Sequence, residues 1–343
     1  MQKLLIFILT CFTFFSCKTE EVYFNANEPA PVTVPAYIKK VGVINRGLLT
    51  DTNGSRKTID DVLSAKGPEL DKECSSECKR GLRDALVQSN MFQGIVFLDP
   101  VHIKNSFPGT FPSPLSWDKI EEICKQNNVD ALFALELFHT DTRINLAASP
   151  ANLMTSGLPA MAGSATIRTT VNTGWRIYDP QNKAILDEWP ITQGLTFNGN
   201  VLNPLDAATA LMNHKEAVMG VSYRIGQSYA GRILPYTIRV CREFYIKGSD
   251  NFKIARRMAD AGDWDKAADL WNKETTNFTP KIRARAYYNM AIMSEMNGNV
   301  DAAIDWAKKA YETGGKRLAL FYLNTLQDRK AQNDLLKYQA HGQ

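Results

Sequence analysis

Few side chains in this sequence have the types and spacings that chemistry requires. Cys74 and Cys78 are four residues apart, which places both on one face of a helix, either as a redox pair or as small buried apolar residues. His139 and Asp141 follow an apolar run at a spacing of two, so a strand would direct both to one face as an acid/base or metal pair. We expect burial for the cysteines and ordinary polar strand-end residues for His139 and Asp141.

The sequence lacks the common motifs of nucleotide-binding and hydrolytic sites. It has no GxSxG, HExxH, GxGxxG or GxxxxGK[ST] pattern, and its four histidines are widely separated. The cysteines after residue 17 are too few for a disulfide framework and do not have zinc-site spacing. We therefore expect no catalytic residue, no metal and no cofactor. The alternative is a hydrolase whose site is assembled from scattered residues.

The beginning of the chain contributes one further reactive group, the thiol of Cys17. Lys3 precedes an apolar run, Leu4 to Phe15, which has the length of a signal peptide and is shorter than the about 20 residues that span a membrane. Ser16 is a small residue directly before Cys17, and the chain turns polar afterwards. This order resembles the bacterial lipobox, in which the peptide is cut before the cysteine and the sulfur is acylated. An ordinary secretory signal is the alternative.

The lipobox resemblance implies a compartment and an anchor. It implies a signal peptide at 1–16, cleavage between Ser16 and Cys17, and fatty acyl groups such as palmitate on Cys17. A protein of this kind resides in the cell envelope, which we expect to be the outer membrane, facing either the periplasm or the cell surface. Residues 17–36 contain Pro, Asn and Glu without clear periodicity, so we expect a flexible tether there.

The length and charge of the chain favour two domains without a nucleic-acid role. A chain of 343 residues exceeds what one hydrophobic core usually organises. The net charge is +4, and removal of residues 1–16 deletes only Lys3, which leaves +3 (4 − 1). This weak bias, without a long Lys/Arg run, argues against nucleic acid as a partner.

Residues 37–235 alternate between the patterns of strands and helices. Their order predicts a mixed α/β sheet domain that ends in a long helix. The patterns are a strand near 37–45, a helix over 69–88, a strand at 95–98, a helix over 117–126, a hairpin over 167–191 and a helix over 205–234. The run at 131–138 is apolar on both alternating faces, which predicts a central strand that is covered on both sides.

Part of this domain resembles a known family. The segment from Cys78 to Asp99, and the helix from Ile120 that leads to Val129 and Asp130, are similar to the domain shared by TolB N-terminal regions and curli-secretion-channel lipoproteins. The resemblance implies an α/β fold over 37–195. It also implies an alternative function, as an accessory or oligomeric component of an outer-membrane secretion or transport assembly. The long amphipathic hairpins of the curli channel are not evident in this sequence.

The C-terminal part, 251–338, has the pattern of paired helices. Residues 284–315 match the tetratricopeptide signature in register, and residues 251–280 match it more loosely. Small residues let two antiparallel helices approach closely, and glycine permits the turn between them. A last helix over 317–338 would cap the open end. The signature positions are Gly262, Ala267, Tyr287, Met290, Ala291, Ser294, Gly298, Ala303, Ala307 and Ala310.

The junction 236–250 mixes aromatic and basic residues. The segment from Tyr229 to Tyr245 resembles the corresponding junction in a family of Bacteroidetes lipoproteins with C-terminal tetratricopeptide repeats. Arg232, Arg239 and Arg242 could line an anionic site, although salt-bridged or solvated side chains are the more frequent reason for such residues.

Together these patterns predict an α/β (mixed-sheet) domain followed by an all-α, tetratricopeptide-like module. The resemblances imply a membrane-anchored envelope lipoprotein. They also imply a non-enzymatic scaffold role, in which the repeats bind a protein or peptide partner. The sequence decides neither the partner nor the oligomeric state.

Overall fold

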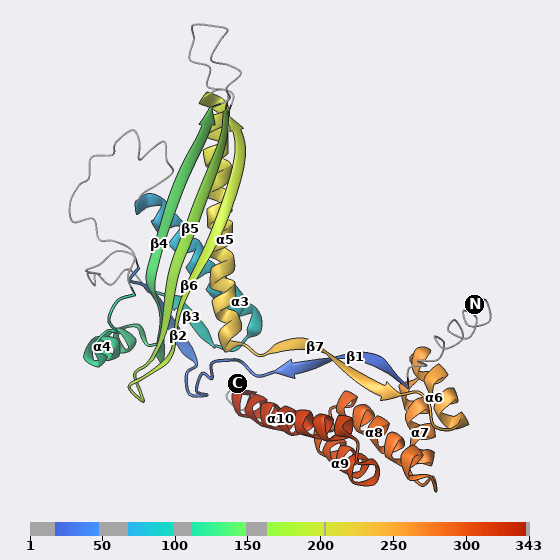
Figure 1. Ribbon diagram of the computed structural model, residues 1–343. Coiled ribbons are helices and arrows are strands. Elements are labelled where there is room, and N and C mark those ends of the chain that lie inside the picture. Colours follow the sequence, from blue (N-terminus) through green and yellow to red (C-terminus); the bar gives the residue numbers. More distant parts are fainter. Residues whose placement is uncertain (1–17, 48–67, 99–110, 149–162, 202–203, 341–343) are drawn as a thin grey trace, which may run out of the picture. The chain divides into compact units, whose positions relative to one another are not determined.

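The chain forms two compact units (Figure 1). One is an α/β unit of residues 30–235, to which residues from 338 on are also assigned, and the other is a mainly helical unit that joins residues up to 29 with 236–337. The predicted fold class, a mixed-sheet domain and a helical module, is confirmed. The computed structural model describes residues 18–47, 68–98, 111–148, 163–201 and 204–340.

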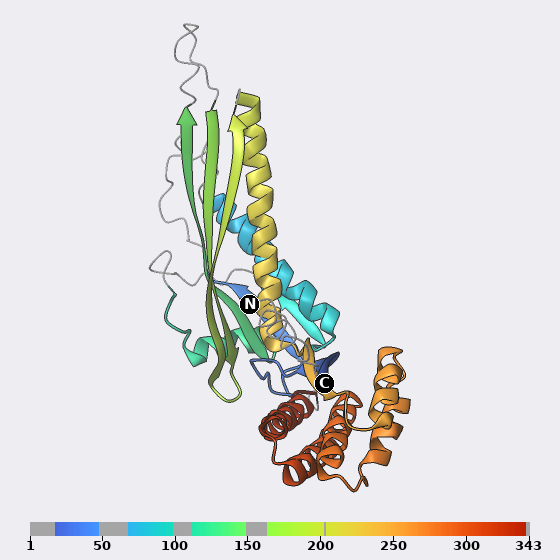
Figure 2. The ribbon, with the colours of Figure 1, turned by 45° about the vertical axis from the view of Figure 1, so that its right-hand side comes forward.

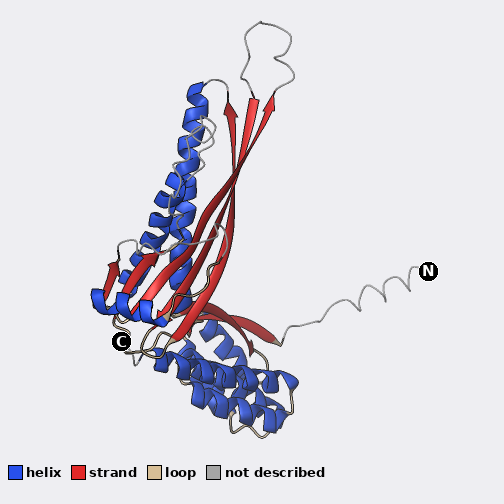
Figure 3. Ribbon diagram, turned by 90° about the vertical axis from the view of Figure 1, so that its left-hand side faces the viewer, coloured by secondary structure: helices blue, strands red, loops and turns tan. Residues whose placement is uncertain are grey.

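A five-stranded mixed sheet forms the centre of the α/β unit (Figure 3). Its order is β3-β2-β4-β5-β6, in which β2 runs parallel to β3 and β4, and β5 runs antiparallel to β4 and β6. The strands are β2 (Lys40–Asn45), β3 (Gly94–Phe97), β4 (Ala131–Ala148), β5 (Gly163–Asp179) and β6 (Ala184–Val201).

The last three strands are longer than the sequence patterns predicted. β2 pairs only with residues 131–135 of β4, so the rest of β4 extends beyond β2 with β5 and β6 as its neighbours. The hairpin expected over 167–191 continues to residues 163 and 201. Its added residues are mostly Ser, Thr, Asn and Gly, several of which have low strand propensity, so the alternating pattern does not mark them.

Helices cover both faces of the sheet around β2 and β4. On one face, Leu82 and Ile225 are fully buried in a core cluster that includes Phe133. On the other face, Ile120 packs in a second cluster with Leu132. This confirms that the apolar run at 131–138 is a doubly covered strand. The helices are α3 (Pro68–Ser89) and α5 (Pro204–Ile233) on the first face, and α4 (Trp117–Asn127) on the second; Figure 2 shows α5 running along the sheet.

α3 and α5 approach each other through two glycines. A Cβ atom on Gly81 would lie 2.0 Å from the carbonyl oxygen of Tyr223. A Cβ atom on Gly226 would lie 1.9 Å from the carbonyl oxygen of Cys78. Because these neighbours are backbone atoms of packed helices, they have little room to move, and the crossing requires glycine at both positions.

The helical unit begins with a strand. β1 (Thr19–Glu28) pairs antiparallel with β7 (Tyr236–Tyr245) along its whole length of 10 residues. The flexible tether predicted over 17–36 is therefore wrong where the structure describes it, and most of the predicted junction 236–250 is also strand. Val22 is buried in the core of the helical unit, and this burial is what orders the segment.

The residues that follow β1 are also ordered and belong to the α/β unit. Val32 and Val34 are buried in its larger core cluster, together with Ile38. The Val32 amide donates a hydrogen bond of 2.8 Å to the carbonyl oxygen of Arg232 at the end of α5. The α/β unit therefore starts at residue 30 and not at the predicted residue 37.

The helices of the second unit follow the predicted helix pairs. The turns between the members of each pair contain Gly262 and Gly298, whose φ angles of +85° and +76° are rare for residues with a side chain. In sequence order, α6 packs against α7, α7 against α8 and α8 against α9. The helices are α6 (Asp250–Asp260), α7 (Trp264–Glu274), α8 (Pro280–Met296), α9 (Val300–Gly314) and α10 (Arg317–Ala340) (Figure 1).

Candidate interaction surface

The signature positions of the helical unit, apart from the turn glycines Gly262 and Gly298, lie in its helix packing. Tyr287 stacks on Trp306 with 5.6 Å between the ring centroids, and Met290 packs against the core cluster. These side chains stabilise the helix pairs. The alanines of the signature that are buried are Ala267, Ala291, Ala303, Ala307 and Ala310.

Glu274 joins the end of α7 to the start of α6. Its carboxylate is buried and accepts hydrogen bonds of 2.7 Å from Ser249, Asn251 and Asn277. Three donors compensate the cost of burying this charge. The contact fixes the loop before α6, where a pocket opens.

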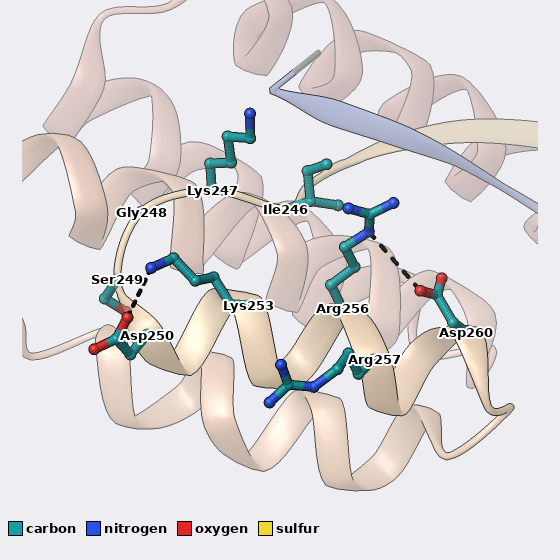
Figure 4. Close-up of a pocket in the computed structure, with 9 residues that line it drawn as sticks. All are labelled: Ile246, Lys247, Gly248, Ser249, Asp250, Lys253, Arg256, Arg257 and Asp260. Atoms are coloured by element: carbon teal, nitrogen blue, oxygen red, sulfur yellow. Dashed lines mark hydrogen bonds and ion pairs between the residues drawn. The ribbon is translucent and has the colours of Figure 1, made fainter. Parts of the chain in front are cut away.

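Figure 4 shows this pocket at the start of α6, with a volume of about 950 Å³. Lys253 donates to Asp250 at 2.9 Å, and the Arg256 Nε atom lies 3.8 Å from Asp260. Arg256 also pairs with Glu20 of β1, with 3.0 Å from Nε to the carboxylate. The acidic residues of the lining are therefore occupied by neighbouring cations.

Two further cations line the same pocket without a counterion. Lys247 and Arg257 form no ion pair with any residue that the structure describes. The lining has four cations, Lys247, Lys253, Arg256 and Arg257, against two carboxylates, so its net charge is positive (4 − 2 = +2). The pocket suits acidic side chains on a partner.

A second groove, of about 470 Å³, lies on the same unit and is called here the Lys18 groove. It is bounded by Lys18, the start of α8, the end of α9 and the start of α10. Tyr245 and Tyr288 form part of its wall, with 5.3 Å between the ring centroids, and burial raises the pKa of both. Its charged lining residues are Lys18, Lys281, Arg285 and Lys316, and no Asp or Glu is among its lining.

Hydrogen bonds from α8 hold the end of β7 beside this groove. Arg285 donates to the carbonyl oxygen of Lys247, and its guanidinium lies over the ring of Tyr245, 5.1 Å from the centroid. The Asn289 side chain accepts from the Tyr245 amide at 2.8 Å and donates to its carbonyl oxygen at 2.7 Å. The amide side chain thus takes the place of a neighbouring strand, and it positions both pockets relative to α8.

The three arginines considered for an anionic site have other partners. Arg232 pairs with Asp187 at 2.8 Å, and Arg242 pairs with Glu295 at 2.7 Å. The guanidinium of Arg239 lies 4.9 Å from the centroid of an aromatic ring of β1. The salt-bridged interpretation is therefore correct for Arg232 and Arg242.

A buried charged cluster in the α/β unit was not predicted. Glu136 lies at a β-bulge of β4, where its carboxylate is 2.5 Å from Arg46 and 3.4 Å from Arg176 and accepts a 2.5 Å hydrogen bond from Tyr178. Burial raises the pKa of Glu136, and the two guanidinium groups oppose this shift. Arg176 also pairs with Glu188 at 2.6 Å. Glu136 is the single charged residue of the apolar run at 131–138, which is the signal that could have revealed the cluster.

The cysteine pair of α3 is buried, as expected. Cys74 and Cys78 are fully buried free cysteines in the core against α5. Burial raises the pKa of Cys74 to about 12 and also raises that of Cys78. Because the thiolate is the reactive form, these thiols are poor nucleophiles.

His139 and Asp141 do not form a site together. The Nδ1 atom of His139 lies 3.4 Å from Asp71 on α3, whereas Asp141 lies 3.4 Å from Arg143. The described part of the chain contains no cluster of three or more His, Cys, Asp or Glu residues that could hold a metal ion.

The predicted lipidation site lies outside the described residues. Ser16, Cys17 and the signal peptide at 1–16 all precede Lys18, the first residue that the structure describes. In the described ranges, no helix combines the length and the apolar character that a membrane crossing needs.

The fold defines a class of protein with a mixed α/β unit and a helical unit that carries charged pockets. A family model described as "Domain of unknown function (DUF8603)" matches residues 38–245, more than half of the chain, and the chain belongs to this family. A second model, described as "Domain of unknown function (DUF6340)", matches residues 253–328 of the helical unit. No curated protein matches the chain.

Solved structures with a similar arrangement include bacterial lipoproteins. The PelC dodecamer from Paraburkholderia phytofirmans is 12% identical, with 63% of this chain and 99% of that chain covered and a TM-score of 0.25. Rare lipoprotein B from Shewanella oneidensis is 13% identical, with 56% and 94% covered and a TM-score of 0.26. Lipoprotein GNA1162 from Neisseria meningitidis is 10% identical, with 53% and 99% covered and a TM-score of 0.16. At these TM-scores the likenesses support no argument about this chain.

Proposed function

We propose that the protein is a lipid-anchored component of the cell envelope, at the outer membrane, whose helical unit binds a protein or peptide partner and catalyses no reaction. The main support for this proposal is the position of β1. β1 begins at Thr19, two residues after Cys17, and pairs with β7 along its whole length. Acyl chains on Cys17 would therefore hold the helical unit itself at the membrane.

The pocket at the start of α6 is the surface that best suits the partner. Its lining has a net positive charge, and Lys247 and Arg257 are available for carboxylates of an incoming segment. The loop before α6 is fixed by Glu274, so the pocket is preformed. A preformed cationic pocket favours an acidic protein segment.

The anchor is tested by Cys17→Ala, which removes the sulfur that would be acylated. We expect the variant to leave the membrane fraction and to lose incorporation of a labelled fatty acid. Cys241→Ala is the matched control, because Cys241 is an exposed free cysteine far from the leader in sequence, and it should remain membrane-bound and labelled. A Cys17→Ala protein that still sediments with membranes would contradict the anchor.

The partner surface is tested by photo-crosslinking in cells from a reactive residue placed at position 253. We expect one defined partner, whose recovery falls when Arg257→Glu reverses a charge of the pocket. Lys273→Glu, on an exposed residue of α7 outside the pocket lining, should leave the recovery unchanged. Equal recovery from all three proteins would exclude this pocket as the docking surface.

One observation favours the alternative of an oligomeric component of a secretion or transport assembly. β6 is an edge of the sheet among the described strands, and it runs for 18 residues. A long edge strand can pair with a strand of another chain. Light scattering after size exclusion distinguishes the two proposals, since the alternative requires a large symmetric oligomer and a monomer would contradict it.

A further inference from the structure

The Lys18 groove combines several cations with little opposing charge. Lys18, Lys281 and Lys316 are exposed and form no ion pair with the residues that the structure describes, and Arg285 is held over Tyr245. Lys18 directly precedes β1, Lys281 and Arg285 lie on α8, and Lys316 lies between α9 and α10. The pairing of β1 with β7 is therefore what brings Lys18 to the other three cations.

The neighbouring carboxylates do not neutralise this group of cations. Glu20 is paired with Arg256, on the pocket at the start of α6. Glu243 accepts a hydrogen bond of 3.1 Å from Thr19 and is exposed to solvent. Glu21, the partner of Glu243 in the strand ladder, accepts a hydrogen bond from the Tyr23 hydroxyl. Four cations line the groove and no Asp or Glu is among its lining, so the groove attracts anions.

The groove is also next to the attachment point of the proposed anchor. Cys17 is bonded to Lys18, and consecutive Cα atoms are about 3.8 Å apart. An acylated sulfur sits at the level of the lipid headgroups, so Lys18 lies within one residue of that layer. This distance is shorter than the Debye length of about 8 Å at physiological ionic strength, so salt screens the attraction only in part.

An exposed aromatic residue lies close to the groove in the sequence. Phe278 is 100% exposed and stands two residues before Pro280, which lines the groove at the start of α8. A fully exposed Phe is costly in water, and at a membrane interface it can insert between headgroups. Aromatic and cationic residues next to an acyl anchor together favour binding at a membrane interface.

We propose that the Lys18 groove is a membrane-docking surface that binds the anionic headgroups of phospholipids in the leaflet that carries the anchor. The proposal rests on the lipidation of Cys17 in the proposed function. An acidic peptide could match the charge of the groove, but it would explain neither the position of Lys18 beside Cys17 nor the exposure of Phe278. Docking adds a second membrane signal to the acyl chains and fixes the orientation of the helical unit.

The test uses the full-length protein purified from cell membranes, on vesicles of phosphatidylcholine alone and on vesicles that also contain phosphatidylglycerol. Amine-specific labelling of Lys18, Lys281 and Lys316 is read by mass spectrometry. We expect labelling to be at least roughly five-fold slower on the anionic vesicles, as follows from the free energy per basic residue near such a surface. High salt should remove much of this protection.

Charge reversal supplies the matched variants. Lys281→Glu combined with Lys316→Glu should abolish the protection of Lys18 on anionic vesicles. Lys308→Glu changes an exposed residue of α9 two positions before Ala310, about 200° around the helix, and should keep the protection. Circular dichroism confirms that each variant is folded.

The outcomes separate docking from anchoring. Flotation with both vesicles and equal labelling on both overturns the docking surface and leaves the anchor standing. Flotation with anionic vesicles only supports docking and overturns the anchor, and flotation with neither overturns both. Protection by a soluble acidic peptide with none by anionic vesicles overturns docking and assigns the groove to a peptide.

Discussion

At the scale of single residues, the carboxylate of Glu136 compensates two buried guanidinium groups. Glu136→Gln removes the charge that pairs with the buried Arg46, and it leaves Arg176 with Glu188 as its counterion. Because breaking one partner of a buried ion pair leaves an uncompensated charge, we expect the free energy of unfolding to fall by about 3–5 kcal/mol. Urea unfolding followed by circular dichroism measures this loss.

The control for this substitution is an ion pair at the surface. Glu122 is exposed and pairs with Lys119 on α4. Glu122→Gln should leave the unfolding midpoint nearly unchanged, because solvent screens such pairs. Similar losses for Glu122→Gln and Glu136→Gln would show that the buried cluster contributes no more to the free energy of unfolding than a surface ion pair.

A second residue predicts how stability depends on pH. His214 is buried with its Nε2 atom 2.6 Å from the Thr169 hydroxyl oxygen, and burial lowers its pKa below the ordinary 6.5. Below about pH 6.5 His214 of the unfolded chain binds a proton that the folded protein excludes. The stability that neutral His214 contributes is therefore complete above that pH and is lost as the pH falls.

This dependence can be isolated by substitution. His214→Gln removes the titrating group, so its melting temperature should fall less than that of the original protein between neutral and mildly acidic pH. All other titrating groups are shared by the two proteins and cancel in the comparison. Parallel pH profiles would show that His214 does not titrate differently on unfolding.

At the scale of elements, the crossing of α3 and α5 depends on glycine. Gly226→Ala would place a Cβ atom 1.9 Å from the carbonyl oxygen of Cys78, so we expect a loss of roughly 1–3 kcal/mol in unfolding free energy. Gly220→Ala on the same helix meets only the end of the Arg224 side chain, at 3.7 Å, and should stabilise by about 0.5–1 kcal/mol through helix propensity. Thermal melts of the two variants should therefore shift in opposite directions.

The sequence predicts some helices and strands better than others, for physical reasons. α4 and α5 were predicted to within a few residues because their apolar periodicity is local. The sequence predicts a tether over β1, although Val22, Phe24 and Ala26 are spaced at intervals of two, because the strand with which β1 pairs is more than 200 residues away in the sequence. The local pattern of one strand does not show which distant segment it pairs with, and burial in a core decides the pairing.

The same limit applied to the candidate surface. Lys18, Lys281 and Lys316 are separate in the sequence, so a search for runs of basic residues does not find them. The buried signature alanines were evident because packing of a helix pair imposes a fixed spacing. Spacing therefore revealed the scaffold, and only the three-dimensional arrangement revealed the groove.

At the scale of the whole molecule, the α/β unit is an insertion between the two strands of a ribbon. Glu28 pairs with Tyr236, so the chain leaves and re-enters the helical unit at adjacent residues. We expect a chain in which Asn-Gly replaces residues 29–235 to form a β1–β7 hairpin and to fold the helices on it. Cooperative unfolding monitored by the fluorescence of Trp271, which is buried in that core, measures the result.

The control for this chain is one that begins at Tyr236 and lacks β1. It loses Val22 from the core and the pairing of β7, so it should unfold with a lower midpoint and less cooperativity. Equal stability of the two chains would show that β1 contributes nothing to the helical unit.

The ribbon also sets the order in which the protein can mature. A chain emerges from synthesis and export with its N-terminus first. β1 therefore stays unpaired until the α/β unit, β7 and the helices after β7 have been synthesised and exported. A chain that stops before Tyr236 can still form the five-stranded sheet, but its β1 segment has no partner strand and Val22 is exposed to chaperones and proteases. Degradation that starts at the N-terminal segment can therefore remove chains that lack the C-terminal part.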